Sequence, residues 1–459
     1  MESLMYQTQL QHSPTRNKPR RGKPKTDSFL EDINQIFLDT MRANGSGTAE
    51  VARTGAILYT SIFDSVNGIS SGKRKQSYRQ YSVDALNAPR HASQYAAALA
   101  ASREVLSSLY PGDTSIDRLD DLLDDIPQGK PQRLGLEWGT AVAQEIISER
   151  EGDGSADSVP YQPNLDIGGF DGDWGSAQYA TVTPFSEGFE LGDFESDGPP
   201  SLSSQEYADS FNEVKQLGSL DSSVRSDDQS EAAKFWQQAS DTSRPTGIAF
   251  EVTEAYADRT TLSLQDEARL FALVGISNLD SLTAAWDAKA EYEFWRPRDA
   301  IRSADADGND LTTADSAWEA FRGEGNQGGS PEYLSGMGVF AGAWSQVLTE
   351  FDQDYTDHRN HSFGGRSYDP FGIEYSSYYG DRHQPSLSSE NSSEFSFDLA
   401  LDTLGSDVVR SYDSFEEAAQ EAANSRVWLG THFGFTADDS LEIGQEVGTF
   451  IYDTQLQQV

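Results

Sequence analysis

Three short segments in the second half of the chain hold residues that could bind an anion. The first contains Lys289 and Arg296, which are seven residues apart. Seven residues make nearly two helical turns, so on one helix both cations would point to the same side. Two such cations among aromatic residues can clamp an oxyanion. Taken alone, the pair is better explained as surface cations bridged to Glu291 and Glu293.

The other two segments add hydrogen-bond donors and a possible nucleophile. Ser335 and Gly336 stand at the start of a predicted helix, where a hydroxyl and free backbone N–H groups can bind an anion. Taken alone, they are better explained as a helix cap. Arg426 and His432 are six residues apart near a predicted helix end, close enough to face one pocket. A single histidine is usually structural, but this one accompanies a third cation.

Together the segments resemble a three-part signature, Lys-x6-Arg-Pro, Pro-Ser-Gly-His and Ser-Arg-x5-His. It belongs to vanadium-dependent haloperoxidases and the type-2 phosphatidic acid phosphatase superfamily. The first and third parts match in order. The resemblance extends to 284–302 and to 52–67, and it covers roughly residues 28–455. It implies an all-α fold of helical bundles, here with long acidic loops.

The resemblance also implies a role for each candidate residue. Three cations would neutralise the oxygens of vanadate, or of phosphate in its place, and two residues would donate hydrogen bonds to them. His432 would be the axial vanadium ligand or the nucleophile toward phosphorus. The implied partners are a small oxyanion with peroxide and halide, or a phosphomonoester. The implied oxyanion ligands are Lys289, Arg296, Ser335, Gly336, Arg426 and His432.

The second part of the signature departs from the family pattern. Met337 stands where the family has the histidine that acts as general acid–base, and Leu334 replaces the proline. Methionine cannot carry a proton, and general acid–base help is typically worth about 10²–10⁴-fold. Thr436 also stands where many relatives have an acidic residue. The catalytic positions are therefore His432 and an inactive Met337.

Two hypotheses remain open at this point. The chain is either a haloperoxidase or phosphatase with impaired or altered activity, or a non-catalytic relative. The second would be a structural or binding protein, such as a virion or assembly component of a halophile. Met337 favours the second hypothesis, whereas the retained anion ligands favour the first. The family also makes a homo-oligomer a mild expectation.

The remaining histidines do not decide between these hypotheses. His358, His361 and His383 follow the second segment, and no spacing rule places them at the pocket or away from it. Asp354 and Asp357 with the first two of these histidines could bind a divalent metal. A solvated acidic loop explains that cluster better.

Helices must position these residues. Apolar periodicity predicts helices at 48–67, 93–110 and 133–150, and the longest apolar-periodic stretch at 267–301. Further helices are expected at 230–240, 335–351, 414–426 and 438–454. Residues 151–230 and 353–412 are expected to be rich in loops. We predict a disordered basic tail at 1–27 and a single domain at 28–459, formed by helices at 28–150, the insertion at 151–230 and a motif-bearing bundle at 231–459.

The charge balance indicates which partners and which environment are compatible with this chain. The chain has 34 Lys and Arg against 75 Asp and Glu, a net charge of −41, which disfavours nucleic acid and anionic lipid. Dense carboxylates with scarce lysine resemble a protein of an extreme halophile, so its cytoplasm or a halophilic virus particle is the expected location. There is no cysteine, no apolar run long enough to span a membrane, and no signal peptide in the sequence.

Overall fold

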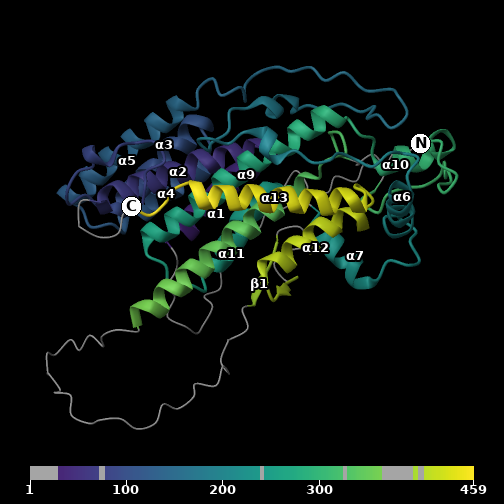
Figure 1. Ribbon diagram of the computed structural model, residues 1–459. Helices are drawn as coiled ribbons and strands as arrows, with labels where there is room; N and C mark the ends of the chain where they lie inside the picture. Colours follow the sequence, from purple (N-terminus) through teal and green to yellow (C-terminus); the bar gives the residue numbers. More distant parts are fainter. Residues whose placement is uncertain (1–28, 72–77, 238–241, 324–327, 364–395, 402–407) are drawn as a thin grey trace, which may run out of the picture.

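The computed structural model describes residues 29–71, 78–237, 242–323, 328–363, 396–401 and 408–459, without the side chains of 70–71 and 357–363. These parts are mostly helical, which confirms the all-α prediction (Figure 1). In the described parts the only strands are β1 (Phe397–Leu399) and β2 (Arg410–Tyr412), which pair antiparallel. None of the described helices is both long and apolar enough to cross a membrane.

The N-terminal helices pack around α2, which contacts α3 and α5. This group consists of α1 (Phe29–Ala43), α2 (Thr48–Ser71), α3 (Gln94–Leu109), α4 (Arg118–Asp124) and α5 (Lys130–Glu149). The C-terminal group consists of α8 (Arg244–Ala257), α9 (Leu264–Tyr292), α11 (Gly336–Phe363), α12 (Phe415–Trp428) and α13 (Gly434–Thr454). Shorter helices are α6 (Gln205–Leu217), α7 (Asp227–Phe235) and α10 (Pro297–Arg302).

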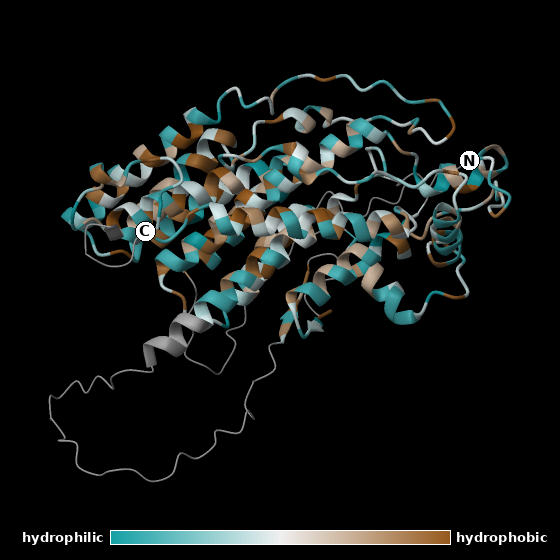
Figure 2. Ribbon diagram, viewed as in Figure 1, coloured by the Kyte–Doolittle hydropathy of each residue, from teal (hydrophilic) through white to brown (hydrophobic). Residues whose placement is uncertain are grey.

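Helix α9 lies between the two groups and contacts both α2 and α11. Most of its residues are buried, because apolar and small side chains occur around its whole circumference. Figure 2 shows the contrast with α6 and α7, which lie at the edge of the molecule and are largely hydrophilic. The helix that carries Lys289 therefore runs through the core, which fixes where its last turn lies.

Helices α11 and α13 cross at glycine residues. A Cβ atom on Gly342 would collide with the Leu441 carbonyl oxygen, and one on Gly444 would collide with that of Val339. The two backbones therefore approach closely, which side chains at these positions would prevent. This crossing fixes the start of α11 relative to the turn before α13, and those two places carry Ser335 and His432.

Two buried aspartates fasten loops to the central helices. Asp64 of α2 accepts hydrogen bonds from the N–H groups of Tyr81, Ser82 and Val83, at 2.7, 2.9 and 2.8 Å. Asp280 of α9 accepts from the N–H groups of Phe185 and Ser186 and from the Ser186 hydroxyl. Burial raises the pKa of Asp64 to about 7 and that of Asp280 to about 6. Asp280 thereby holds part of the 151–230 segment over α9.

Several expected boundaries were wrong. The expected loops at 151–230 contain α6, and those at 353–412 begin with the last turns of α11, while α8 lies in a stretch for which no helix was expected. The longest predicted helix is interrupted, because α9 ends at Tyr292 and α10 begins at Pro297. Glu293 adopts a left-handed φ of 44°, and proline disfavours a helical conformation at the residue before it. The division into a tail and a single domain stays a prediction, and the tail lies outside the described residues.

Candidate functional site

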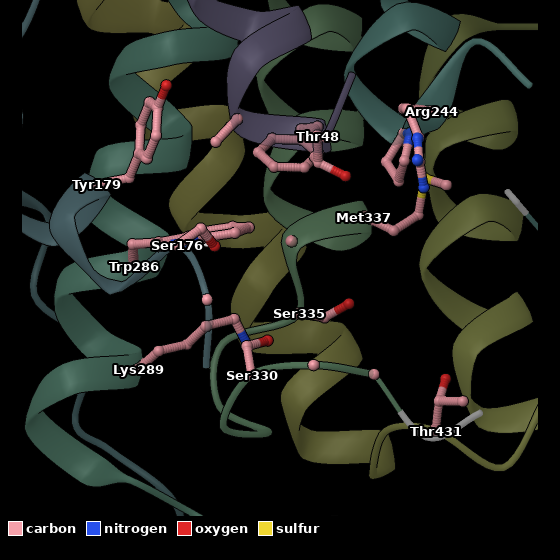
Figure 3. Close-up of a pocket in the computed structure, with 18 of the residues that line it drawn as sticks. Thr48, Ser176, Tyr179, Arg244, Trp286, Lys289, Ser330, Ser335, Met337 and Thr431 are labelled. Atoms are coloured by element: carbon pink, nitrogen blue, oxygen red, sulfur yellow. Dashed lines mark hydrogen bonds between the residues drawn. The ribbon is translucent and has the colours of Figure 1, made fainter. Parts of the chain in front are cut away.

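The candidate residues surround one pocket with a volume of about 580 Å³ (Figure 3). The end of α9, the residue before α10, the start of α11, the end of α12 and the turn before α13 form one part of its wall. The start of α2, the segment 175–179, the start of α8 and the loop before α11 form the rest. All six predicted oxyanion ligands line it, as does Met337. The structure thus brings together the three sequence segments, and the lining residues predicted from them are Lys289, Arg296, Ser335, Gly336, Met337, Arg426 and His432.

Lys289 and Arg296 reach the pocket from different elements. The expectation that one helix carries both is wrong, since Lys289 is in the last turn of α9 and Arg296 is the extended residue before α10. The expected pairing with Glu291 and Glu293 is also not found. Both cations are buried, at 2% and 4% exposure, so they are not surface residues.

Both cations already donate to the chain. Lys289 Nζ donates to the carbonyl oxygens of Pro331 and Glu332 at 2.5 and 3.1 Å. The Arg296 guanidinium donates to the Ser330 carbonyl oxygen at 2.8 Å and to that of Thr431 at 3.0 Å. Carbonyl dipoles partly compensate these buried charges. The two cations therefore tie the loop before α11 and the turn before α13 to the pocket wall.

His432 is held between a cation and a buried carboxylate. Arg296 Nη1 lies 3.0 Å from Nε2, and Glu332 Oε1 lies 2.9 Å from Nδ1. Because a guanidinium can only donate, Nε2 accepts, and Nδ1 then carries the proton and donates to Glu332. Burial, together with the positive charges of Arg296 and Lys289, lowers the pKa of His432 well below its usual value. The imidazole is therefore neutral, with its Nε2 lone pair on the side of Arg296.

Glu332 is a site residue that the sequence reasoning missed. It is fully buried and also accepts from the Phe433 N–H at 3.0 Å and the Thr436 hydroxyl at 2.9 Å. Burial raises its pKa to about 7, although Arg296 opposes the shift. Thr436 stands where many relatives have an acidic residue, and here its hydroxyl contacts the carboxylate of Glu332 from the second motif segment. Glu332 lies three residues before Ser335, and this closeness to the second motif was the one signal in the sequence that could have identified it as a site residue.

Arg426 leaves part of its guanidinium without a partner. Its Nη2 donates to the Trp236 carbonyl oxygen at 2.5 Å, whereas its Nε is buried and has no hydrogen-bond partner among the described residues. Burial, with Arg322 and Arg296 nearby, lowers its pKa to about 9. Arg322 lines the same pocket and was also missed. Both arginines stay charged at neutral pH.

Ser335 and Gly336 form the start of α11. The Ser335 N–H donates to the Ser440 hydroxyl at 2.8 Å, so its backbone donor is used, while its hydroxyl lines the pocket. A Cβ atom on Gly336 would lie 3.3 Å from the Trp286 ring. Trp286 in turn stacks on Phe340 with centroids 6.3 Å apart. An aromatic wall therefore stands beside the cationic part of the pocket.

Met337 is 4% exposed and has no ionisable group to offer the pocket. Figure 3 shows it on the same side of the pocket as Arg244. Among the described residues His432 is the only histidine that lines the pocket. At 1.5 Å per residue, the backbone at 358 and 361 lies about 33 and about 38 Å along α11 from Gly336. Residue 383 lies outside the described residues.

The metal site considered at 354–361 gains no support. Asp354 accepts a hydrogen bond from the Tyr452 hydroxyl at 2.6 Å, and the side chains at 357–361 lie outside the described residues. No cluster of three or more metal-binding side chains occurs in the part of the chain that the structure describes.

The chain is similar to known proteins in part of its sequence and in its fold. Residues 269–459 match the family described as the second helical-bundle domain of VCPO. The structure is similar to that of the first bacterial vanadium-dependent iodoperoxidase, with a TM-score of 0.71, 20% identity, and coverage of 96% of this chain and 99% of that one. No curated protein gave a significant match.

Two further solved structures resemble the chain less closely. The apo form of a bacterial vanadium-dependent chloroperoxidase gives a TM-score of 0.61 at 15% identity, covering 89% of this chain and 94% of that one. A holo form gives 0.59 at 15% identity, with coverage of 89% and 92%. These likenesses show that the chain has the helical fold of the bacterial vanadium haloperoxidases.

Proposed function

We propose that the pocket binds vanadate, or phosphate in its place, as a haloperoxidase- or acid-phosphatase-like site. The observation that carries this proposal is the buried Nε–H of Arg426, which has no partner in the described chain and belongs to a side chain that lines a pocket with other buried cations. A buried donor without an acceptor costs about 1–3 kcal/mol, and more when it is charged. An oxyanion would supply the missing acceptors.

The residues present fit such a group. Lys289, Arg296 and Arg426 would neutralise its oxygens, and the Ser335 hydroxyl and the Gly336 N–H would donate further hydrogen bonds. The neutral His432 has its Nδ1 proton held by Glu332, so Nε2 is left as ligand or nucleophile. Bound vanadate would supply a Lewis-acidic centre for peroxide chemistry with halide, whereas phosphate binding would suit hydrolysis of phosphomonoesters.

We infer that turnover is impaired or altered in this chain. Met337 lies in the pocket at the family's acid–base position and cannot give or take a proton. The general base role is also not open to Glu332, which is committed to His432, Phe433 and Thr436. Such catalysis is typically worth about 10²–10⁴-fold, so the expected activity is lower than that of a site with histidine by about this factor.

Titration calorimetry with orthovanadate in concentrated salt tests the binding proposal. Saturable binding by the wild type and its loss in His432→Ala are expected. A wild type that shows no saturation, or a variant with the same affinity as the wild type, would sink the proposal. Melting curves of both proteins without vanadate control for unfolding.

A second candidate function is non-catalytic, and Met337 is the observation that favours it. The chain would then keep the fold and the anion for a structural or binding role, for example in a virion or another assembly. Bromide oxidation with peroxide and p-nitrophenyl phosphate hydrolysis separate the candidates when measured in the wild type and in Met337→His. Activity gained only by the variant supports a disabled site, whereas brisk turnover by the wild type contradicts our interpretation of Met337.

We also propose a high-salt setting, supported by the net charge of −41. Molar salt screens repulsion between carboxylates. The midpoint of thermal unfolding should therefore rise steeply between dilute buffer and molar KCl. A fold that is equally stable in both would count against an extreme halophile or its virus.

A further inference from the structure

Arg322 is a cation of the pocket that lies outside the three-part signature. It stands in the loop between α10 and α11, and its side chain lines the same pocket as His432 and Arg426. The sequence offers no spacing that links it to the three segments, so only the folded chain brings it there. Three signature cations and one further cation thus line the pocket, and the buried carboxylate of Glu332 interacts with two of them, Arg296 and Lys289.

The backbone fixes Arg322 relative to His432. The Arg322 N–H donates to the Leu429 carbonyl oxygen at 3.1 Å, and the Phe321 N–H donates to that of Gly218 at 2.8 Å. Arg225 lies over the Phe321 ring, 3.6 Å from its centroid. Leu429 precedes His432 by three residues in the same turn. These contacts therefore hold the Arg322 backbone against the turn that carries His432, and the side chains of both residues line the pocket.

The guanidinium of Arg322 lacks the partners that a structural arginine has. Its Nε is buried and has no hydrogen-bond partner among the described residues. Arg302, beneath the same loop, contrasts with it because its Nε donates to the Trp318 carbonyl oxygen at 3.0 Å and its Nη2 pairs with Glu319. In the described structure no carboxylate forms an ion pair with Arg322. Its charge also helps to lower the pKa of Arg426, so the two cations repel each other.

We propose that Arg322 is a further direct ligand of the oxyanion, which makes the pocket a four-cation site for a doubly charged tetrahedral anion. The inference rests on the proposed function and deepens it by naming the ligand class and a new ligand. A permanently charged donor here compensates electrostatically for the protonatable histidine that Met337 replaces. It adds binding strength but no proton transfer, because a guanidinium does not titrate near neutral pH.

Calorimetric titration of the full chain with orthovanadate, and separately with inorganic phosphate, tests this assignment in concentrated KCl. The variants are Arg322→Gln, which removes the charge, and Arg322→Lys, which keeps the charge but loses the Nε donor. Arg302→Gln is the matched control, because it makes the same charge change beneath the same loop without touching the pocket. Arg322→Gln should bind both anions roughly 10- to 100-fold more weakly, as expected for a charged hydrogen bond. Arg322→Lys should be intermediate, and Arg302→Gln should stay within about twofold of the wild type.

The outcomes separate this inference from the proposed function. If the wild type binds neither anion, both fail. If the wild type binds and Arg322→Gln binds as tightly, only the role of Arg322 fails. Nitrate, a planar monoanion, distinguishes a directional ligand from a general charge, since an equal loss for nitrate and phosphate would overturn the assignment. If Arg322→Gln does not fold and Arg322→Lys binds like the wild type, Arg322 is structural and the assignment is overturned.

Discussion

Two regions of this molecule that contain buried ionisable side chains differ in how fully the hydrogen bonds of those side chains are satisfied. On α2, Asp64 is surrounded by three backbone donors from one loop. In the pocket, Arg426 and Arg322 each keep a buried Nε–H without a partner in the described chain. A buried carboxyl group whose hydrogen bonds are complete within the chain holds a loop onto the fold. A buried donor whose bonds are incomplete costs stability until an acceptor reaches it. Among the described residues Arg150, which does not line the pocket, also has such an Nε–H, so for Arg426 and Arg322 it is the combination with their place in the pocket wall that points to a ligand.

The largest effect is expected from removing the satisfied charge. Asp64→Ala would leave the N–H groups of Tyr81, Ser82 and Val83 without acceptors, and it should lower the free energy of unfolding by about 3–5 kcal/mol. Urea unfolding measures this loss. Vanadate affinity, measured on protein that is still folded, should not change. A parallel loss of affinity would mean that the two regions are not distinct.

Removing the unsatisfied charge should have the opposite pattern. Arg426→Met should weaken vanadate binding roughly 100-fold, because a buried charged donor is lost. Stability without anion should change by less than about 1 kcal/mol, since the repulsion with Arg296 and Arg322 is relieved. Calorimetry and urea unfolding on one preparation give both numbers. A large loss of stability in this variant would contradict the comparison.

A smaller effect is expected at Glu332, whose hydrogen bonds are satisfied within the chain but which also orients the pocket residue His432. Glu332→Gln keeps the shape of the side chain but weakens the bond that fixes the His432 tautomer. Vanadate affinity should fall about tenfold, the lower end of what outer-shell partners contribute. The NMR titration of His432 should also change, whereas a purely structural residue would leave it alone. Thr436→Val, which removes only one hydrogen bond to the same carboxylate, provides the milder comparison.

The smallest effect is a difference in pH dependence between the regions. Burial raises the pKa of Asp64 to about 7. At pH values above the ordinary pKa of an aspartate, the folded state therefore binds more protons than the unfolded state. Its contribution to stability is therefore complete below about pH 4 and is lost as pH rises to 7. Burial lowers the pKa of Lys289 below the ordinary lysine value near 10. The folded protein therefore gains stability relative to the unfolded chain as pH rises toward 10, whereas anion affinity falls because the positive charge is lost. Urea midpoints across pH for the wild type and Asp64→Asn should differ mainly between pH 4 and 7, and equal slopes would contradict this account.

The sequence predicted which residues line the pocket better than it predicted the bounds of the helices. Lys289 and Arg296 were expected on one helix, yet they meet because α9 ends and the chain turns before Pro297. The periodicity of apolar residues continues through that break, so it could not reveal it. Helices α6 and α8 were missed, since the first lies among Gly- and Ser-rich loops and the second in a stretch that had no strong pattern. The fold class itself followed from the motifs, because they resemble those of an all-helical family.

The site was predictable only where residues are close in sequence to a motif. The three segments fix seven of the lining positions, and all seven surround one pocket. Glu332 lies beside the second segment, but its contact with His432 spans 100 residues and has no spacing rule. Arg322 depends on a loop that is anchored to Leu429, which is a tertiary contact. Whether these residues bind an oxyanion remains a proposal.

The hydrogen bond between Arg296 and His432 competes with the binding of an anion to either residue. In the structure, the 3.0 Å bond joins the two groups that an incoming anion would need for itself. Binding is then an exchange in which Arg296 gives up the imidazole and takes an oxygen, so the measured affinity is the difference between two contacts. An imidazole released in this way changes from an acceptor of Arg296 into a free electron-pair donor at the moment the anion arrives. If the proposed anion site is right, Arg296 therefore keeps Nε2 of His432 occupied until an anion binds.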